Sequence, residues 1–385
     1  MFEIQEVKGQ KARIKVIGVG GAGGNAINNM ISSNLHGVEF VAINTDMQAL
    51  ETSLAPVKVQ IGANLTRGLG AGSNPQIGKE AALEDGTAIA EALEGSDIVF
   101  ITAGMGGGTG TGAGPVIAGI SKELGAITVA VITKPFFYEG KMRWINAEEG
   151  IKELRKNVDT LIVIPNDRIG LIVEKGTPLL KSFAIANDVL KQAVQGISDI
   201  ILIPGLINVD FADVRTIIED KGRGVMGSGL GRGEGGAIEA AKKAISNPLL
   251  EESSIEGAKG ILINITGGLE LSLNDVQEAA SFIYDSAHEE VHLIFGAVID
   301  PDIGDEVRVT VIATGFNDQR EKVELPQIKK WTPIKHPVSF RGSERVLSKN
   351  LKPDYSVDIV PTEIMSYEDR IDVPAFMRKA PQKEI

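Results

Sequence analysis

Gly104-Met-Gly-Gly-Gly-Thr-Gly-Thr-Gly-Ala-Gly114 follows directly on the apolar run Ile98-Val-Phe-Ile-Thr-Ala103, and apolar residues at helical spacing resume at 115–124. This order predicts a buried parallel strand, a glycine loop and a helix. Glycines let successive backbone N–H groups turn toward one ligand, and the helix adds its own free N–H groups and the positive end of its dipole. The stretch therefore predicts a cradle for polyphosphate, with the hydroxyls of Thr109 and Thr111 as further donors. A linker is the alternative, but linkers rarely lie between a buried strand and a helix.

A second glycine loop, Gly18-Val-Gly-Gly-Ala-Gly-Gly-Asn25, follows a short strand expected at 12–17 and precedes a helical run at 26–32. It contains G-x-G-x-x-G, and Asp46 closes the next expected strand, 39–46, at the spacing of a dinucleotide-binding fold. Taken alone, this motif favours an oxidoreductase. The two glycine loops together weaken that interpretation, because loops at the carboxyl ends of parallel strands would surround one triphosphate from both sides. The Walker pattern is absent, so the phosphates lack a P-loop lysine.

The composition is that of a globular chain, with 385 residues, 43% hydrophobic side chains and a net charge of −12. Such a chain buries a sizeable core and most simply forms two domains. The absence of cysteine excludes disulfides, thiolate metal sites and cysteine nucleophiles. The charged N-terminus and the lack of an apolar run of about 18 residues predict neither a secretory signal nor a membrane span, so the cytoplasm is expected. The acidic charge argues against coating nucleic acid, and it implies Mg²⁺ beside any phosphate-rich ligand.

Beyond the glycine loops the pattern predicts an α/β fold, with a parallel Rossmann-like sheet, a long central helix and a second mixed α/β region. Further strands are expected at 126–133, 160–164, 260–266, 290–298 and 308–314. Helices are expected at 77–93, 179–203 and 237–245, and the glycine-rich segment 221–235 is expected to be a loop.

Two further segments of the N-terminal half offer candidate contacts to a nucleotide. The glycine-rich segment 67–75, which includes Ala71 and Gly72, either closes over the terminal phosphate or is an ordinary surface loop. Glu139 and Arg143 flank a turn. They either bind a sugar or simply pair with each other at the start of a helix.

Polar residues also interrupt two apolar patterns farther along the chain. Asn187 lies in the apolar stripe of the long helix, one turn after Phe183. A buried amide usually satisfies backbone groups, which is the favoured interpretation from the residues alone, but beside Phe183 it could bind a purine edge. Asn208, Asp210 and Asp213 precede and begin the next helix. Helix capping accounts for one aspartate at a helix start, but it accounts less well for Asn208, Asp210 and Asp213 together.

Together these motifs resemble the FtsZ family, the bacterial tubulin-like division GTPases, from about Arg13 to the C-terminus. Gly-Gly-Gly-Thr-Gly-Thr-Gly at 106–112 is similar to the tubulin-family signature, and 208–213 is similar to the family's catalytic loop. Asp-Val-Pro-Ala-Phe-Met-Arg-Lys at 372–379 is similar to its C-terminal partner-binding peptide.

The resemblance implies GTP and GDP as ligands, with Mg²⁺ held mainly through the GTP phosphates and no metal-ligating side chain assigned. It reverses the structural interpretation of Asn187, which it assigns to guanine. Many relatives carry Asp there, so looser base selectivity is expected. The residues that it assigns to phosphates, ribose and base are Gly21, Ala22, Gly23, Gly24, Asn25, Ala71, Gly72, Gly104, Gly107, Gly108, Thr109, Gly110, Thr111, Glu139, Arg143, Asn166, Phe183 and Asn187.

For activity, the resemblance implies hydrolysis that depends on assembly. The catalytic loop of the next subunit would cover the nucleotide, with Asp210 and Asp213 orienting water and Asn208 completing the site. Repeated head-to-tail contacts would then give filaments that form the cytokinetic ring at mid-cell. The alternatives are a specialised tubulin-like paralogue acting as a nucleotide-regulated scaffold, and a nicotinamide-dependent oxidoreductase.

The expected division of the chain follows from the same motifs. The segments are an N-terminal tail (1–11), a GTP-binding domain (12–178), the central helix (179–203), a C-terminal α/β domain with the catalytic loop (204–316), a disordered linker (317–366) and a partner-binding peptide (367–385). That peptide is expected to bind membrane-tethering division proteins, so that membrane contact is indirect. The basic stretch 329–352 of the linker is either a solvated tether or a contact for an anionic partner.

Overall fold

One sheet organises the described part of the chain. The structure, a computed structural model, describes residues 12–173, 176–203, 205, 207, 209–219, 221–248, 255–287 and 291–316. All of them belong to the first of two compact units, Met1–Lys322 and Val323–Ile385. The strands are β1 (Ile14–Val19), β2 (Val38–Asn44), β3 (Val57–Gln60), β4 (Ile98–Gly104), β5 (Ile127–Lys134), β6 (Thr160–Pro165), β7 (Gly222–Arg232), β8 (Gly260–Gly267), β9 (His292–Ile299) and β10 (Glu306–Thr314).

Helices connect most of these strands. They are α1 (Gly20–Ser32), α2 (Met47–Glu51), α3 (Ala63–Thr66), α4 (Pro75–Glu84), α5 (Gly86–Leu93), α6 (Thr109–Glu123), α7 (Lys141–Arg155), α8 (Asn166–Ile172), α9 (Leu179–Leu202), α10 (Phe211–Ile218), α11 (Gly236–Ile245) and α12 (Leu273–Asp285), with short 3₁₀ turns η1 (Phe137–Glu139), η2 (Ile255–Gly257) and η3 (Pro301–Ile303). Among the described helices, none is both long enough and apolar enough to span a bilayer.

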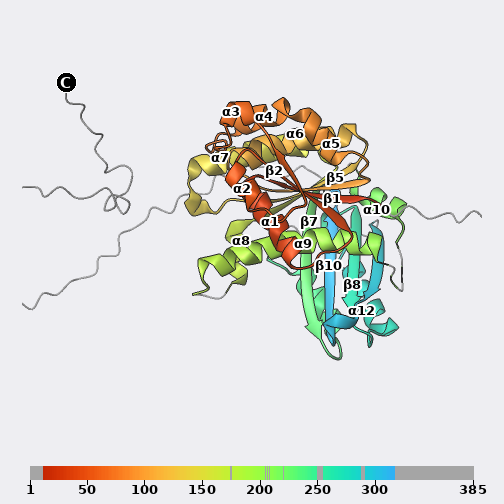
Figure 1. The fold of residues 1–385 in the computed structure, drawn as a ribbon. Coiled ribbons are helices and arrows are strands. Elements are labelled where there is room, and N and C mark those ends of the chain that lie inside the picture. The colour runs from red at the N-terminus through yellow and green to blue at the C-terminus, as the bar shows by residue number, and fades with distance from the viewer. Residues whose placement is uncertain are drawn as a thin grey trace, which may run out of the picture. The chain divides into compact units, whose positions relative to one another are not determined.

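The strands pair in the order β3-β2-β1-β4-β5-β6-β7-β10-β8-β9 (Figure 1). Neighbours from β3 to β7 are parallel, β10 runs antiparallel to both β7 and β8, and β8 and β9 are parallel. This confirms the predicted α/β fold with a mostly parallel sheet. Strands that precede α9 in the sequence and strands that follow it join this one sheet. The expected domain boundaries stay predictions.

Helices cover both faces of the parallel strands, which explains why these strands are apolar along their whole length. Along β4, Ile98 and Phe100 pack with α1, α9 and α10 on one face. Val99 and Ile101 pack with α4, α5, α6 and α7 on the other face. A third apolar cluster lies between the β7–β10 region and the helices α11 and α12. The parallel strands are therefore buried, and their carboxyl ends carry the loops.

The expectation that 221–235 is a loop is wrong, because β7 is a strand of 11 residues. It pairs along its length with β10. A Cβ at Gly229 or Gly231 would overlap the backbone of α11, at Ala240 and Gly236 respectively. The glycines of β7 therefore let α11 pack directly on the strand. In the sequence alone, a strand with so many glycines looks like a loop.

Three expected helices have boundaries that differ from expectation. The helix expected at 77–93 is broken at Asp85, whose carboxylate accepts a hydrogen bond from the Gly62 N–H at 2.6 Å. The helices expected at 26–32 and 115–124 begin earlier, at Gly20 and Thr109, inside the glycine stretches. Glycine destabilises the interior of a helix, which is why these stretches are expected from the sequence to be loops. In the first turn of a helix the N–H groups have no partner within the helix in any case.

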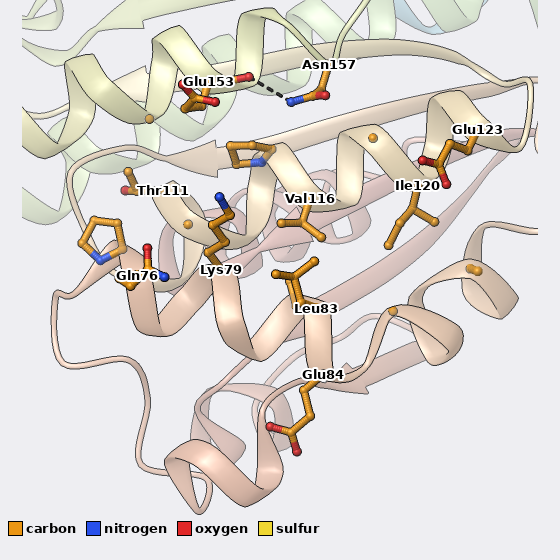
Figure 2. Close-up of a pocket in the computed structure, with 18 of the residues that line it drawn as sticks. Gln76, Lys79, Leu83, Glu84, Thr111, Val116, Ile120, Glu123, Glu153 and Asn157 are labelled. Carbon is orange, nitrogen blue, oxygen red and sulfur yellow. Dashed lines mark hydrogen bonds between the residues drawn. The ribbon is translucent and has the colours of Figure 1, made fainter.

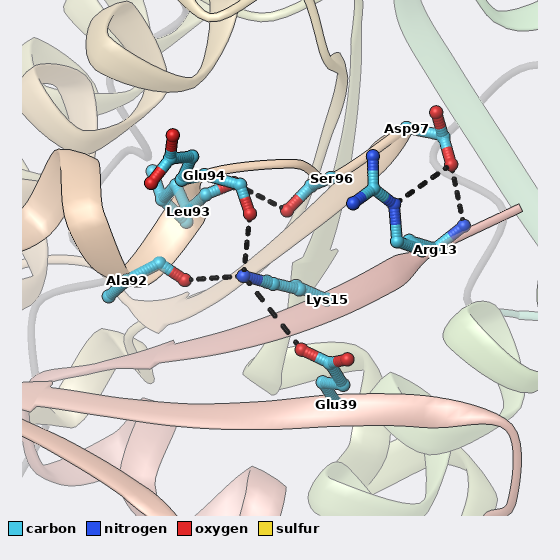
Figure 3. Close-up of polar contacts among 8 residues, drawn as sticks. All are labelled: Arg13, Lys15, Glu39, Ala92, Leu93, Glu94, Ser96 and Asp97. Carbon is cyan, nitrogen blue, oxygen red and sulfur yellow. Dashed lines mark hydrogen bonds and ion pairs between the residues drawn. The ribbon is translucent and has the colours of Figure 1, made fainter.

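Polar contacts fix the amino ends of the central strands (Figure 3). The Lys15 ammonium donates to the carbonyl oxygens of Ala92 and Glu94, at 2.8 and 3.1 Å, where α5 ends. The Arg13 N–H donates to the carboxylate of Asp97 at 2.7 Å. A cation at a helix C-terminus compensates the last carbonyl groups and the helix dipole. These contacts anchor α5 to β1 at the edge opposite the glycine stretches.

A carboxyl group is half-buried between α9 and the second half of the sheet. Asp199 lies with Asn264 of β8 and Arg308 of β10 around a small cavity. Burial raises the pKa of Asp199 from 3.8 to about 6, and a hydrogen bond from Gln195 and the charge of Arg308 offset only part of this effect. The folded protein therefore carries an unfavourably placed charge at neutral pH.

We expect Asp199→Asn to raise the free energy of unfolding at pH 7.5 by about 1–2 kcal/mol, because the amide removes a buried charge. The folded-state pKa lies above the unfolded value, so this carboxyl contributes stability below about pH 4 and loses it as the pH rises through about 6. Urea unfolding of the wild type from pH 5 to 7.5 should show this decline, and the variant should show a flatter profile.

The matched control is Asp188→Asn on the same helix, where the carboxylate forms an ion pair with Lys191 at 2.6 Å and is partly exposed. This control should keep the wild-type dependence on pH. An Asp199→Asn variant with the wild-type pH profile would contradict the assignment.

Candidate functional site

Two helices begin at the carboxyl ends of adjacent parallel strands. β1 leads directly into α1, and β4 leads through a short glycine turn into α6, with Val19 paired in register with Ala103. Neither helix has a side-chain N-cap hydrogen bond or an acidic residue in its first turn. The free N–H groups and positive dipole ends of both helices are therefore available to one anion.

The two glycine stretches interlock through close backbone contacts. Gly20 has a φ of +70°, and a Cβ there would lie 3.0 Å from the Gly110 nitrogen. A Cβ at Gly104 would lie 2.6 Å from the Ala22 side chain. Any larger residue at these positions would push the two helix starts apart, so the glycines set the width of the site.

Other glycines of the same stretches border open space. A Cβ at Gly21, Gly24 or Gly107 would meet no heavy atom within 4 Å. These positions present backbone where a ligand can approach closely. The site thus has tightly packed walls and an accessible backbone surface, which fits a phosphate chain.

The segment 67–75 lies against the glycine stretch 104–114. A Cβ at Gly108 would stand 2.7 Å from the Cβ of Ala71, which is buried. Asn74 caps α4 by accepting from the Gln76 N–H at 3.0 Å. Ala71 and Gly72 are therefore positioned beside the cradle, and closure over a terminal phosphate stays a prediction.

The two threonines of the signature have different surroundings. The Thr109 hydroxyl lies 2.7 Å from the hydroxyl of Thr45, which follows directly after β2. Sequence reasoning missed Thr45, although its position directly after a strand was a usable signal. The buried Thr111 hydroxyl accepts from the Gly106 N–H at 2.8 Å and so shapes the loop.

Asp46 caps α2 by accepting from the N–H groups of residues 48 and 49. This use weakens the oxidoreductase interpretation, which needs that carboxylate for a ribose.

Glu139 and Arg143 form an ion pair of 3.0 Å at the start of α7. Glu139 also accepts from the Phe136 N–H at 2.8 Å, which holds η1 in place. The pairing considered in the sequence analysis is thus present, and a contact with ribose stays a prediction. The Phe137 N–H donates to Asp167 at 3.0 Å and joins η1 to α8.

An aromatic cluster completes the other side of the site. The ring of Phe136 stacks on Tyr138 at 4.9 Å and meets the edge of Phe183 at 5.8 Å. Phe183 is 41% exposed, and Asn187 lies one turn further along α9. Sequence reasoning missed Phe136 and Tyr138, although the aromatic run Phe-Phe-Tyr was a usable signal. The exposed ring and the neighbouring amide can stack on a purine and bind its edge.

Asn166 provides an unpaired acceptor at the same end of the sheet. It is the first residue of α8, directly after β6, and only 8% of it is exposed. Within the described structure its Oδ1 has no hydrogen-bond partner. Buried polar atoms are nearly always satisfied, so this oxygen is suited to accept a hydrogen bond from a ligand.

The proposed catalytic aspartates lie at the start of α10. Asp210 caps α10 by accepting from the Asp213 N–H at 2.8 Å. The far end of α10 lies at the amino end of β6, where the Thr160 hydroxyl donates to the Ile218 carbonyl at 2.6 Å. The glycine stretches follow the carboxyl ends of the parallel strands. Asn208 lies outside the described residues.

The described residues contain no group of three or more His, Asp or Glu side chains arranged to hold a metal ion. The acceptors that a hard cation such as Mg²⁺ requires would therefore have to come largely from a bound phosphate chain and water.

Comparisons with known proteins agree with this arrangement. The sequence profile of the tubulin/FtsZ family GTPase domain matches residues 13–174, and that of the FtsZ family C-terminal domain matches residues 222–317. An empty FtsZ dimer from M. jannaschii is 44% identical, with a TM-score of 0.77, covering 84% of this chain and 97% of that one.

Two further structures extend the comparison. A mutant M. jannaschii FtsZ is 46% identical, with a TM-score of 0.76, covering 80% of this chain and 92% of that one. CetZ2 from Haloferax volcanii, solved as a GTPγS-bound protofilament, shares only the fold, at 20% identity and a TM-score of 0.67, with 80% and 94% covered. The chain therefore belongs to the tubulin/FtsZ family, and within it to FtsZ.

Proposed function

We propose that the protein binds GTP between the starts of α1 and α6, hydrolyses it, and assembles head-to-tail into filaments. The observation that carries this proposal is the convergence of two uncapped helix N-termini on one space walled by glycine backbone. Membership of a GTPase family supports guanine nucleotide as the anion that fills it. The chain has an acidic net charge, so helix N–H groups rather than lysines would neutralise the phosphates.

The remaining proposed contacts are with the ribose, the base and the phosphates of the nucleotide. The ribose would lie beside the Glu139–Arg143 pair, and the base would stack on Phe183 with Asn166 and Asn187 at its polar edge. Mg²⁺, bound mainly through the phosphates, would neutralise part of their charge when present. Within the chain, backbone N–H groups position the phosphates, and the described residues beside them offer no carboxylate placed as a general base.

Hydrolysis would then depend on a second copy. The last turn of α10, the helix that Asp210 caps, lies at the edge of the parallel sheet opposite the glycine stretches, so one copy stacked on the next would bring this helix toward a neighbour's nucleotide. There they would orient the attacking water, and Asn208 would help to complete the site. The solved dimer of an FtsZ relative supports self-association. A repeated heterologous contact of this kind gives open filaments, which we propose form the cytokinetic ring at the cytoplasmic face of mid-cell.

Nucleotide identification tests the proposal most directly. The purified protein is denatured, and the released base is identified by chromatography. Guanine nucleotide is expected, whereas nicotinamide dinucleotide would support the oxidoreductase instead. Light scattering should then rise with GTP and not with GDP. Scattering with GTP without phosphate release would favour the nucleotide-regulated scaffold.

The base contact gives a separate prediction. We expect Asn187→Asp to raise the preference for GTP over ITP about tenfold, because a carboxylate accepts from both N1–H and the N2 amino group of guanine, and inosine lacks that amino group. Competition binding against a fluorescent guanine nucleotide measures the ratio. Asn187→Leu is the control and should lose affinity for both nucleotides without raising the ratio. An unchanged ratio in Asn187→Asp would place the base elsewhere.

The C-terminal segment lies outside the described residues and is proposed from its sequence alone. Ile371, Phe376 and Met377 are apolar residues among charged ones, a pattern typical of a docking peptide. Removing 367–385 should leave GTPase activity and polymerisation nearly intact and abolish binding to a membrane-tethering division protein. A pull-down with the synthetic peptide tests this, with loss of capture expected for Phe376→Ala. Equal capture by a scrambled peptide would contradict it.

A further inference from the structure

A groove of about 1090 Å³ runs along α6 on the face of the sheet that α4, α5 and α7 cover (Figure 2). Its floor is formed by α6, including Val116 and Ile120. One wall comes from α4 and α5, and the other comes from α7. This groove is separate from the aromatic cluster and the open glycines of the candidate nucleotide site.

The groove exists because both walls contact α6 closely at one end. A Cβ at Gly112 would overlap the backbone of Pro75 at the start of α4. A Cβ at Gly150 of α7 would overlap the side chain of Thr111. Along the floor beyond these contacts, the half-buried positions of α6 that line the groove are small or apolar, namely Pro115, Val116, Gly119 and Ile120. The result is a trough, closed near the start of α6, that a rod-like ligand can enter.

Its surface combines exposed apolar residues with an acidic rim. Leu83 is 60% exposed and Leu124 is 45% exposed, although both are large apolar side chains. The charged residues that line the groove are four glutamates and a single lysine, namely Glu84, Glu123, Glu149, Glu153 and Lys79. The glutamates come from both walls and the floor helix, so they lie on more than one side of the apolar strip.

All four glutamates of the acidic rim are exposed. A hydrogen bond and ion pair from Lys156 at 2.7 Å lowers the pKa of Glu153. A ligand that fits must therefore present apolar groups to the floor and positive charge to the rim.

We propose that this groove docks a basic amphipathic helix of a partner protein. A helix with its side chains is about 10 Å wide and presents an apolar stripe between polar flanks, which matches an apolar floor between acidic walls. A second copy of this chain is a poorer occupant, because no described helix carries more than one net positive charge.

The test uses a fluorescein-labelled 18-residue helical peptide with one leucine face and one lysine face. Its binding to the full-length GDP-bound protein is followed by anisotropy. Glu123→Lys/Glu149→Lys is expected to weaken binding at least tenfold, and Leu83→Asn by a smaller factor, because it removes an apolar contact without changing the charge. Lys79→Gln should strengthen it two- to threefold, since it removes the cation within the groove.

Two controls separate docking from general attraction to an acidic protein. Glu270→Lys/Glu278→Lys makes the same change of charge at exposed positions outside the groove, and it should bind within twofold of wild type. A scrambled peptide of equal composition should bind at least tenfold more weakly. Equal loss in the control variant, or equal binding of the scrambled peptide, overturns the proposal. So does a dimer of the GDP-bound protein that Leu83→Asn dissociates in sedimentation, because a second copy would then occupy the groove.

Discussion

Gly107→Asp is expected to weaken GTP binding at least a hundredfold while the protein keeps its fold. Gly107 lies between β4 and α6, and a Cβ there would meet no heavy atom within 4 Å. Its φ is not in the left-handed region, so the substitution introduces no backbone strain. A carboxylate at about 5 Å from a phosphate charge, with an effective dielectric constant of about 20, costs about 3 kcal/mol, which corresponds to about a hundredfold in affinity.

The matched control is Gly107→Asn, which adds a side chain of the same size without the charge. We expect its affinity for GTP to fall much less than that of Gly107→Asp. Calorimetric titration measures both affinities, and thermal unfolding should show both variants close to the wild-type Tm. If Gly107→Asp bound GTP as the wild type does, the phosphates would have to lie elsewhere in the structure.

Local patterns were sufficient to predict much of the fold. The run Ile98–Ala103 is apolar throughout because both faces of β4 are covered, and its residues are buried as expected. The long helix expected at 179–203 is α9, which ends one residue earlier, at Leu202. Apolar runs and helical spacing depend on residues that are close in sequence, so they can be recognised without knowledge of tertiary contacts.

The errors share a different cause. The glycines of β7 are required by α11, and α1 and α6 begin inside the glycine stretches, with free N–H groups in their first turns. Composition alone assigns such glycines to loops. In the candidate site, Thr45 meets Thr109 across 64 positions, and Phe136 meets Phe183 from another element. Pairings between distant segments are decided by the packing of the sheet, which no local pattern encodes.

Asp210→Asn is expected to lower the rate of GTP turnover at least a hundredfold while GTP affinity stays within twofold of wild type. Asp210 also caps α10 through the Asp213 N–H, so replacement by alanine would mix catalytic and structural effects. Asparagine caps a helix about as well as aspartate, but it lacks the charge needed to polarise water. Asp210→Ala should show the same loss of turnover together with about 1 kcal/mol less stability.

Mixing two inactive variants identifies where the carboxylate acts. Gly107→Asp is expected to lose GTP binding but keeps Asp210, whereas Asp210→Asn binds GTP but supplies a defective loop. In a head-to-tail filament the intact loop of the first variant meets the GTP of the second, so phosphate release should return in the mixture although each variant alone is inactive. The control replaces the first variant by Gly107→Asp/Asp210→Asn, and that mixture should stay inactive. If the first mixture stayed inactive although the two variants sedimented together in filaments, Asp210 would act within its own chain or only through the cap of α10.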